Sequence, residues 1–547
     1  MRILKKIIEK KELFLILIII VFGLLLRIYN LKDHFIFAYD QARDAQRVFE
    51  IISNKDLKIV GPETDIPGVF NGPLLYYLTL PLYFLSNFNP NVVVILFILI
   101  NLSAVILFYF FCIKILNNLY IFLISSILWI FSYAQLNFAR FISNASPMSI
   151  CTLGFFVGLA FYFLKKEKSG LILSSVFLAF AIHFNFYLIY LLLVYPIFYL
   201  IYKPKLLIKE LLMSVFIFLI LISNFLMAEI KWNFLGIKSL FNFFNHQSGN
   251  FYPVIESLSI YLQRFGEAIY YSIFSFNLFL GLILFLTLTY LSLKVIKNYK
   301  EKIFIFIWLF STLPLFGFRS GVINGTVINS SLFPILTLIA ASGLYYFIKR
   351  KENYLTYSFI TLIIFSNIFL LFKDKISLKL FSLQPLVYKY EKELIDYTYS
   401  ELNRSKNKNF SICVVSNPLF INTLWSYLYF FYGKNNYNYL PYYAGPKQYL
   451  NKNFLPYDRN HTKLRFLIIE PLGGIPEHAK KATIYKEDQV SKLIEEKRFG
   501  DIVVQKRILT ENKSELVDTQ KLSSQEKNEL EKITKSDPRY SCYHTYD

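Results

Sequence analysis

Long apolar runs separated by short polar loops dominate the first 373 residues of the chain. Most runs are about 17–25 residues long, the length that a helix needs to cross roughly 30 Å of hydrocarbon. They cover residues 13–26, 90–116, 118–138, 146–164, 170–202, 206–228, 270–294, 302–318, 328–348 and 354–372. This pattern predicts an all-α polytopic membrane domain.

The run 170–202 decides the expected number of spans. It is too long for one ordinary span and is interrupted by the sequence His-Phe-Asn at 183–185. Two short helices turning there give eleven spans and place the basic loops near Lys165, Lys203 and Lys349 on the cytoplasmic side, as the positive-inside rule requires. A single span would move the later basic loops to the outer side. We therefore expect eleven spans.

This topology places the long polar segments on the outer side of the membrane. No small-residue cleavage site follows the first run, so we expect a retained signal anchor with a cytoplasmic N-terminus. The chain is then a multi-pass integral protein of the plasma (inner) membrane. The outer segments are 31–89, 139–145, 229–269, 319–327 and everything after about 373. Chemistry is expected there, because short basic inner loops mostly serve orientation.

The last third of the chain has a different character. It is polar and rich in Lys, Asn and Glu, with short β-like runs at Ser411–Val415, Leu464–Glu470 and Asp501–Ile508 and an aromatic helix at Leu419–Tyr432. The pattern predicts a small extracytoplasmic α/β domain followed by a loose polar tail. The expected domains are therefore a membrane domain at 1–375, a soluble domain at 376–510 and the tail at 511–547.

Composition supports the membrane assignment. Of the 547 residues, 55% are hydrophobic and 17% are charged, and the mean hydropathy is +0.43. The net charge of +21 does not indicate a nucleic-acid partner, because Lys and Arg cluster in short loops between apolar runs and in the last third.

The four cysteines show no CxxC motif and no paired spacing. Cys112 and Cys151 lie in apolar runs, where a small buried hydrophobic residue is the usual role. Neither a metal site nor a disulfide framework is expected from Cys413 and Cys542.

The first outer loop carries the strongest charge constellation. At helical spacing, Asp40, Arg43, Asp44 and Arg47 lie on one face of a predicted surface helix, with Val48, Ile51 and Ile52 on another. A turn and a second aromatic, amphipathic piece follow, up to about residue 88. The simplest interpretation is an interfacial helix whose charges pair with each other; the other is a reaction site.

Two stretches in this loop resemble a known family. The Asp-Gln-Ala-Arg at 40–43 and the Gly-Pro-Leu-Leu-Tyr at 72–76 are similar to signatures of the C-type (GT-C) superfamily of polyprenyl-phosphate-sugar glycosyltransferases. The nearest likeness is to bacterial members related to protein O-mannosyltransferases and the lipid A aminoarabinose transferase. That superfamily has Asp-Glu-x-Arg or Asp-x-x-Arg in its first outer helix and Pro-Pro-Leu-x-Tyr in the second. Here Gln41 replaces the Glu, and the first Pro is absent.

Further likeness follows in the same order along residues 10–375. The stretch 139–147 resembles a Ser-Arg-x-x-Trp-Asn-Pro outer loop without its Trp, 179–186 resembles a short-pair turn, and 228–231 resembles a Phe-Glu-x-(Lys/Arg) step. One feature departs from the family. The His-Tyr pair that these relatives carry before a late span is replaced by Asn-Ser-Ser near 329–331.

The resemblance implies transfer of a sugar from a polyprenyl-phosphate donor to a protein, lipid or glycan acceptor at the outer face, with inversion. Asp40 would be the general base, with Asp44 as second choice. Positive charge would stabilise the leaving phosphate. The expected substrate-binding residues are Arg43, Tyr76, Arg140, Asn144, His183, Glu229, Lys231, Arg264 and Arg319. No metal ion or other cofactor is expected, although some members of the superfamily use a divalent cation.

Each assignment has a structural alternative. Arg43 would then only orient Asp40, and Arg140 would snorkel to lipid headgroups. His183 would be a hydrogen-bonded buried histidine, and Glu229 would pair with Lys231 at the rim.

Two other functions explain part of the pattern. A transporter or lipid flippase predicts inverted repeats and broken helices in both halves, whereas the sequence shows one break and no symmetry. A non-catalytic scaffold predicts no charge cluster at the membrane surface. An O-antigen-type polymerase or ligase would carry its long basic outer loop late in the spans.

Overall fold

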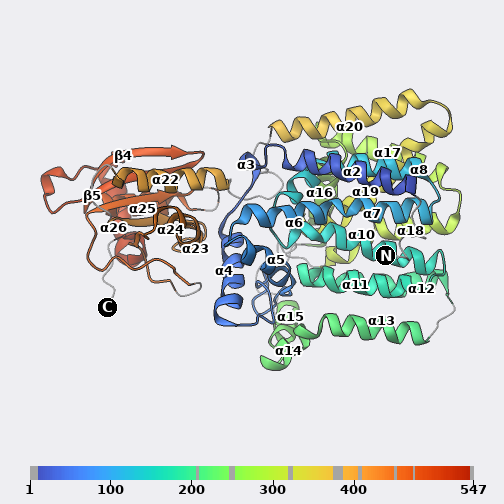
Figure 1. Ribbon diagram of the computed structural model, residues 1–547, viewed down its shortest axis with the longest axis horizontal. Coiled ribbons are helices and arrows are strands. Elements are labelled where there is room, and N and C mark those ends of the chain that lie inside the picture. The colour runs from blue at the N-terminus through green and yellow to red at the C-terminus, as the bar shows by residue number, and fades with distance from the viewer. Residues whose placement is uncertain are drawn as a thin grey trace. The chain divides into compact units, whose positions relative to one another are not determined.

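The computed structural model contains two compact units (Figure 1). It describes residues 10–204, 208–245, 253–317, 325–373, 386–403, 409–448, 452–471, 473 and 475–542. Unit 1 comprises 1–29, 56–81 and 93–375, and unit 2 comprises 30–55, 82–92 and 376–547. The chain passes from unit 1 to unit 2 after 375, and unit 2 also takes in two parts of the first outer loop.

Helices form unit 1 and cross its length in alternating directions (Figure 1). In chain order they are α2 (Lys10–Ile28), α5 (Leu74–Leu85), α6 (Pro90–Leu102), α7 (Ala104–Tyr109), η1 (Phe110–Ile115), α8 (Leu119–Phe131), α9 (Tyr133–Ala139), α10 (Ala145–Phe163), α11 (Ser169–Phe184), η2 (Phe186–Leu193), α12 (Val194–Tyr202), α13 (Ile208–Leu221), α14 (Ser223–Lys231), α15 (Leu235–Asn245), α16 (Val254–Ser272), α17 (Leu278–Val295), α18 (Tyr299–Leu309), η3 (Leu313–Gly317), α19 (Gly325–Lys349) and α20 (Asn353–Lys373). Of these, α5 and α6 continue into unit 2.

Fewer helices than predicted meet the length and hydropathy of a membrane span. Among the described residues, five stretches do so, and two bent pairs, α8 with α9 (64°) and α13 with α14 (54°), raise the number to seven. The prediction was eleven. The other four predicted spans coincide with α2, α11, η2 with α12, and α18, which are shorter or carry more charge.

The predicted turn in the run 170–202 is confirmed. Helix α11 ends at Phe184, and Asn185 is extended with φ −153° and ψ 115°. The Asn185 side chain accepts a hydrogen bond from the backbone N–H of Tyr187 at 3.0 Å and so begins η2. Helices often begin after an asparagine in an extended conformation whose side chain accepts the backbone N–H two residues later.

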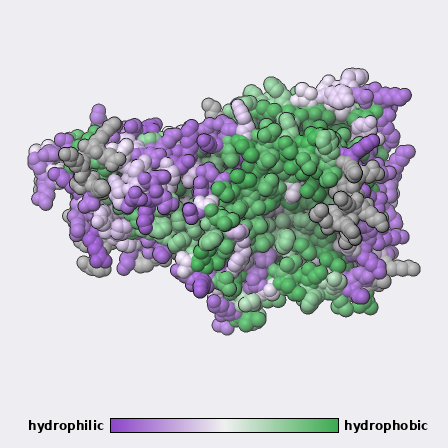
Figure 2. All heavy atoms as spheres, viewed as in Figure 1, coloured by the Kyte–Doolittle hydropathy of each residue, from purple (hydrophilic) through white to green (hydrophobic). Residues whose placement is uncertain are grey.

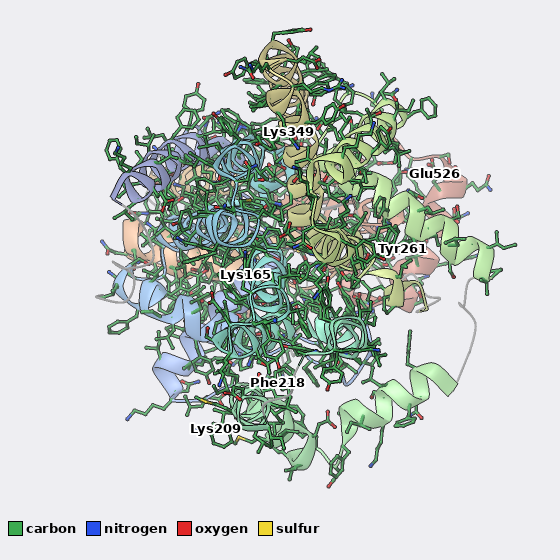
Figure 3. The ribbon with its side chains drawn as sticks, turned by 90° about the vertical axis from the view of Figure 1, so that its right-hand side faces the viewer. Lys165, Lys209, Phe218, Tyr261, Lys349 and Glu526 are labelled. Carbon is green, nitrogen blue, oxygen red and sulfur yellow. A yellow bond between two sulfur atoms is a disulfide. The ribbon has the colours of Figure 1, made fainter. Side chains whose placement is uncertain are left out.

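The side of unit 1 and one of its ends differ in polarity. Figure 2 shows hydrophobic residues along the side and hydrophilic residues at the end that lies on the right of the view. Lys165, Lys209 and Lys349 lie at or next to the ends of helices, at this same right-hand end of unit 1 (Figures 1 and 3). Large apolar side chains of its helices, such as Phe216, Phe279 and Phe365, are exposed, as expected of helices that face lipid.

Unit 2 contains one five-stranded sheet in the order β2-β1-β3-β5-β4. The strands are β1 (Ser411–Val415), β2 (Tyr442–Tyr443), β3 (Leu464–Ile469), β4 (Ser491–Phe499) and β5 (Ile502–Leu509). Strand β1 is parallel to β2 and β3, and β5 is antiparallel to β3 and β4. The helices are α3 (Leu31–His34), α4 (Tyr39–Asn54), α22 (Tyr388–Asn403), α23 (Thr423–Leu428), η4 (Tyr429–Gly433), α24 (Lys434–Tyr437), α25 (Glu477–Asp488), η5 (Lys513–Glu515), α26 (Ser524–Ser536) and η6 (Pro538–Tyr540). The expected α/β domain is thus confirmed.

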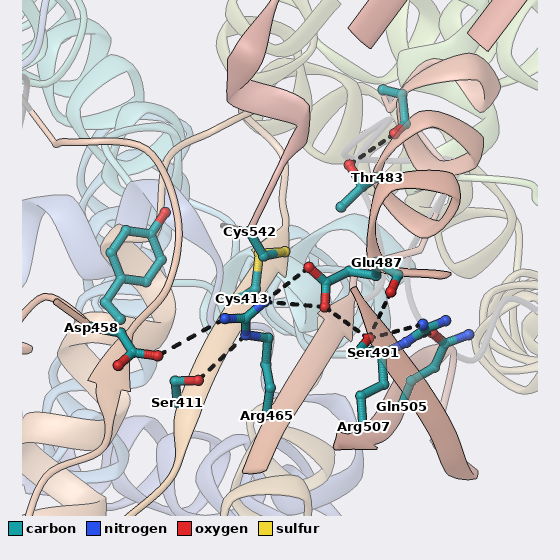
Figure 4. The surroundings of a disulfide bond; sticks show 12 residues. Ser411, Cys413, Asp458, Arg465, Thr483, Glu487, Ser491, Gln505, Arg507 and Cys542 are labelled. Carbon is teal, nitrogen blue, oxygen red and sulfur yellow. Dashed lines mark hydrogen bonds and ion pairs between the residues drawn. A yellow bond between two sulfur atoms is a disulfide. The ribbon is translucent and has the colours of Figure 1, made fainter. Parts of the chain in front are cut away.

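A disulfide joins Cys413 on β1 to Cys542 near the C-terminus, across 129 residues (Figure 4). The expectation that these cysteines are unpaired was wrong, because the fold brings together positions that no local spacing relates. Cys112 and Cys151 are free and buried, as predicted.

Residues 511–542 contain η5, α26 and η6, whereas the sequence predicted a loose tail. Leu530 on α26 and Tyr540 on η6 belong to the same hydrophobic cluster as Leu467 of β3. Beside the disulfide, Arg465 forms a buried ion pair with Glu487 at 3.0 Å (Figure 4). The sequence did not predict these helices, because most residues of α26 are polar or charged and only one narrow face is buried.

Candidate active site

Helix α4 carries the acidic constellation and begins with an unusual cap. Ala38 has no side chain that can bind the first turn, so the Gln41 side chain reaches back and accepts the Ala38 backbone N–H at 3.0 Å. This is half of a capping box. Gln41, which replaces the Glu of the family signature, therefore serves the helix start.

The buried face of α4 holds it within unit 2. Ala42, Ala45 and Val48 are fully buried in one stripe. At the far end of this stripe the Phe49 ring lies edge-on to Phe431 with centroids 5.4 Å apart. This packing explains why residues 30–55 of the first outer loop belong to the same unit as the C-terminal domain.

Arg43 bridges the two carboxylates of α4. Its Nη1 donates to Oδ1 of Asp40 at 2.7 Å, and its Nη2 lies 2.9 Å from Oδ1 of Asp44. The guanidinium also lies 5.6 Å from the centre of the Tyr39 ring. A guanidinium held at three points has little freedom, so the positions of both carboxylates are fixed relative to each other.

The two carboxylates differ in environment. The Asp40 side chain is 57% exposed and that of Asp44 is 11% exposed. Burial raises the pKa of Asp44 to about 6, against the opposing effect of the Arg43 charge. Asp40 is thus open to a reactant, while Asp44 is a buried partner of Arg43.

Arg47 does not join this cluster. Sequence spacing placed it on the same face as Asp40, but its guanidinium turns to Glu50, with Nη1 and Oε2 2.9 Å apart. Glu50 lies three residues after Arg47, a spacing at which two helical side chains are neighbours. The long Arg47 side chain therefore pairs with Glu50 and not with Asp40 or Asp44.

In unit 1, two of the sequence motifs meet. The backbone N–H of Gly72 donates to the carbonyl oxygen of His183 at 2.9 Å, and Oδ1 of Asn71 accepts the backbone N–H of Phe186 at 3.0 Å. A Cβ atom on Gly72 would overlap the His183 ring. The Gly-Pro-Leu motif is therefore docked on the turn at 183–185, with glycine required by the close approach.

His183 has a structural role in this arrangement. Its side chain is largely buried, and its Nε2 lies 2.8 Å from the carbonyl oxygen of Leu221. Its Nδ1 is buried and has no hydrogen-bond partner in the described part of the chain, and a role in substrate binding stays a prediction.

Arg140 is 3% exposed and binds the end of α2. Its Nε donates to the carbonyl of Arg27 at 2.9 Å, and its Nη2 donates to those of Leu26 at 3.0 Å and Tyr29 at 2.9 Å. A cation at a helix C-terminus satisfies carbonyls that have no partner in the helix. Its Nη1 is buried and has no hydrogen-bond partner in the described part of the chain, and a role in substrate binding stays a prediction.

Glu229 and Lys231 do not form the expected rim ion pair. The Glu229 carboxylate accepts the backbone N–H of Ile237 at 3.3 Å, in the first turn of α15, where a negative charge is favourable. Lys231 is exposed.

Arg264 on α16 is a different kind of cation. Its Nη1 pairs with Oε2 of Glu267 at 2.7 Å, while its Nε is buried and has no hydrogen-bond partner in the described part of the chain. A buried N–H of a guanidinium that lacks an acceptor costs free energy. Arg264 therefore has unused hydrogen-bonding capacity, as does Arg140, whose Nη1 is also buried without a partner in the described part of the chain.

The other expected residues are placed as follows. Tyr76 on α5 is 3% exposed, and Asn144 precedes α10 with a buried Oδ1. Arg319 lies outside the described residues. None of these positions tests a role in substrate binding, so the assignments stay predictions.

Sequence reasoning missed two buried polar groups. In unit 1, Arg27 is fully buried and donates to Oδ1 of Asn101 at 2.8 Å, and Asn101 in turn donates to Gln135 at 2.9 Å. In unit 2, Glu391 is fully buried, and burial together with the nearby Glu470 holds its pKa well above the usual range. The signal for the first group was available, since polar side chains inside apolar runs are rare.

A metal site is not apparent in the described parts of the chain. Among these residues, no group of three or more His, Cys, Asp or Glu side chains is arranged to hold an ion. Asp40 and Asp44 share a guanidinium instead. Independence from a metal stays a prediction.

Comparisons with known proteins support the expected fold. No protein-family model matches the sequence, and no curated protein matches it. Two similar solved structures are those of ArnT from Cupriavidus metallidurans in the apo state (TM-score 0.55, 9% identity) and bound to undecaprenyl phosphate (TM-score 0.55, 10% identity). Each match covers 90% of this chain and 97% of the other. Likeness at this identity shows the fold alone, and the predicted architecture, a helical membrane domain with a small C-terminal α/β domain, is confirmed.

Proposed function

We propose that the chain is a membrane glycosyltransferase that moves a sugar from a polyprenyl-phosphate donor to an acceptor at the outer face of the membrane. The observation that carries this proposal is the shared fold with ArnT over 97% of that chain, combined with an acid–arginine–acid cluster on α4. Neither a transporter nor a scaffold explains both features.

The donor class rests on the second ArnT structure. That protein is bound to undecaprenyl phosphate, a lipid phosphate of the kind that a polyprenyl-phosphate sugar leaves behind. Unit 1 presents a hydrophobic side suited to a donor whose tail stays in the bilayer (Figure 2). The identities of the sugar and of the acceptor do not follow from these observations.

Asp40 is the proposed general base. Its carboxylate accepts the proton of an acceptor hydroxyl or amine as the acceptor atom attacks the anomeric carbon. The bond between that carbon and the phosphate oxygen breaks, and the polyprenyl phosphate leaves with the electron pair. Attack opposite the leaving group inverts the anomeric centre. A positioned base contributes typically about 10²–10⁴-fold in rate.

Arg43 and Asp44 would position this base. Arg43 holds Oδ1 of Asp40 at 2.7 Å, and Asp44 holds Arg43 from its buried side. The second oxygen of Asp40, on a side chain that is 57% exposed, is the one we assign to the acceptor proton.

The leaving phosphate needs positive charge. Within unit 1 we assign this role to Arg264, because its side chain is 35% exposed and its Nε has no partner among the described residues. Arg140 is a less accessible candidate, because it is 3% exposed and makes three bonds at the end of α2, although its Nη1 also has no partner among these residues. Lys231 stays an exposed second candidate.

The disulfide supports the outer location of the C-terminal domain. Disulfides persist in oxidising compartments and are rare in the cytosol, and Cys413 and Cys542 are joined in unit 2. This favours an extracytoplasmic C-terminal domain, and the basic loops between the apolar runs favour a cytoplasmic N-terminus.

The test is transfer by the purified full-length protein in nanodiscs. Radiolabelled polyprenyl-phosphate sugars are supplied singly with a panel of glycan, lipid and peptide acceptors, and release of polyprenyl phosphate is followed together with the labelled product. Inversion is checked by NMR of the product's anomeric proton. Absence of transfer with every pair, alongside donor movement across the bilayer of proteoliposomes, would favour the flippase alternative instead.

A further inference from the structure

Unit 2 contains a polar pocket, apart from α4, that the proposed reaction does not use. Its volume is about 260 Å³, just below the range of about 300–1,000 Å³ for sites of drug-sized ligands. The turn at 86–91, helix α22 and the segment from α23 to α24 line it. All of these segments belong to unit 2, so the pocket is a property of that unit alone.

Aromatic side chains form the buried floor of this pocket. Tyr427 and Tyr388 are 1% and 5% exposed. Tyr427 Oη donates to the carbonyl of Phe88 at 2.6 Å, and the Phe88 ring stacks on Phe431 at 4.5 Å. The floor is therefore preformed, and a ring with an apolar face can pack on it without rearrangement.

Asparagines form the exposed rim. Asn435 and Asn436 donate their Nδ2 groups to the backbone carbonyls of Phe431 and Tyr432 at 2.8 and 3.0 Å. Their Oδ1 atoms thereby keep acceptor capacity. Asn87 is exposed, in the left-handed region with φ 51°. Amides that both donate and accept match the hydroxyl groups of a sugar, which also do both.

Lys392 supplies the charge of the lining. Its Nζ lies 4.8 Å from the centre of the Tyr388 ring and 5.8 Å from that of Tyr432. Burial lowers the pKa of this amine. No described residue of the lining carries a carboxylate. The pocket thus favours an anionic substituent on an otherwise neutral, polar ligand.

Asp396 and Glu393 act on Lys392 from outside the lining, and Asp396 is bound to the Tyr432 hydroxyl at 3.0 Å. We propose that this pocket binds one sugar residue of an acceptor glycan, with a preference for a residue that carries a carboxylate or phosphate group. The inference rests on the proposed function for its role, because it names the acceptor class of that reaction. The aromatic floor receives the C–H face of the ring, the asparagine rim binds its hydroxyls, and Lys392 binds the acidic group.

The test is binding of two simple probes to the full-length protein in nanodiscs, without any donor. Methyl glucoside and methyl glucuronide are titrated by saturation-transfer NMR. We expect both to bind, the glucuronide more tightly. In Asn87→Gly the new glycine tolerates the positive φ at this position. The variant should weaken the binding of both probes about three- to tenfold. Lys392→Met should remove the preference for the glucuronide.

Matched controls lie outside the pocket in the same unit. Asn438 is also exposed in the left-handed region, with φ 66°, so Asn438→Gly should leave binding unchanged. Lys434→Met is the control for Lys392→Met.

Absence of binding by both probes, or equal binding by wild type and the pocket variants, would overturn the proposal. Binding of inorganic phosphate that depends on Lys392, without sugar binding, would identify an anion site instead. Because no donor is present, loss of transfer with intact sugar binding would count against the proposed reaction and not against the pocket.

Discussion

The backbone N–H of Gly72 donates to the carbonyl oxygen of His183 at 2.9 Å, with no room for a side chain between them. This contact joins the Gly-Pro-Leu motif that follows the first outer helix to the turn at 183–185, more than a hundred positions away. Two features that the sequence presents separately are thus one structural joint of unit 1. Its glycine is required by packing rather than by chemistry.

Gly72→Ala should destabilise the protein. The new methyl group would overlap the His183 ring, whose Nε2 is held by the carbonyl of Leu221. Overpacking of this kind costs typically about 1–3 kcal/mol. Thermal unfolding of the detergent-solubilised protein measures the change. Gly266→Ala is the control, since the nearest atom to its Cβ would be a flexible Leu278 methyl at 3.2 Å. Equal melting temperatures for the two variants would contradict the argument.

Arg140→Met should lower stability by roughly 2–4 kcal/mol, because it removes three charge-assisted bonds and leaves the carbonyls at the end of α2 without partners. Arg140→Lys should recover only part of this loss, since an ammonium lacks the planar fork of donors. The measurement is the melting temperature of the two variants, with Lys231→Met, which changes an exposed cation, as the control. A stable Arg140→Met protein that binds the donor more weakly would show instead that Arg140 binds the phosphate.

Local patterns in the sequence predicted the elements that depend on local physics. The apolar runs gave the helices of unit 1, and the polar interruption at 183–185 gave their turn. Strands β1 and β3 were recognised because they are buried and mostly apolar, and β5 because it begins with a short apolar run. Strand β4 was missed because it lies at the edge of the sheet, where most of its residues are exposed and charged.

Relationships between distant segments were beyond the same reasoning. The sequence identified Asp40, Arg43 and Asp44 as neighbours on one helix face, which helical spacing alone decides. Spacing alone could not show that Arg47 forms an ion pair with Glu50, or that Arg140 donates hydrogen bonds to the carbonyls at the end of α2. Such contacts depend on how helices pack, and several arrangements satisfy the same spacing.

Cys542→Ser should loosen the C-terminal segment. Loss of a disulfide that closes a loop of this length costs about 2–5 kcal/mol, and here it also releases η6 from the hydrophobic cluster of unit 2. Limited proteolysis of the full-length protein should then cut after 510 in the variant and in reduced wild type, but not in oxidised wild type. Cys151→Ser is the control. Identical digestion patterns would show that packing alone holds the segment.

The buried carboxyls of unit 2 should make its stability depend on pH. Burial raises the pKa of Glu470 to about 7 and that of Glu391 well above the usual range. The folded state therefore keeps protons that the unfolded chain releases, so stability present below about pH 4.5 is lost as pH rises toward 7. Glu391→Gln should raise the melting temperature by about 3 °C or more at pH 8 and less at pH 5. Exposed Glu393 provides the control, Glu393→Gln, and an equal effect at both pH values would contradict the assignment.

Asp40→Asn should reduce the rate of transfer by about 10²–10⁴-fold at saturating acceptor, because the amide cannot accept the acceptor's proton. Donor binding should be unchanged, since the helix and its buried stripe do not depend on this exposed side chain. Glu50→Gln, on the same helix, should keep full activity. Asp44→Asn should cost less than Asp40→Asn, because Arg43 keeps its 2.7 Å bond to Asp40. Initial rates with a fixed donor and varied acceptor separate these cases. If Asp44→Asn is the more damaging change and abolishes an acidic limb near pH 6, where burial places the Asp44 pKa, then the buried carboxylate is the base and Asp40 its positioning partner.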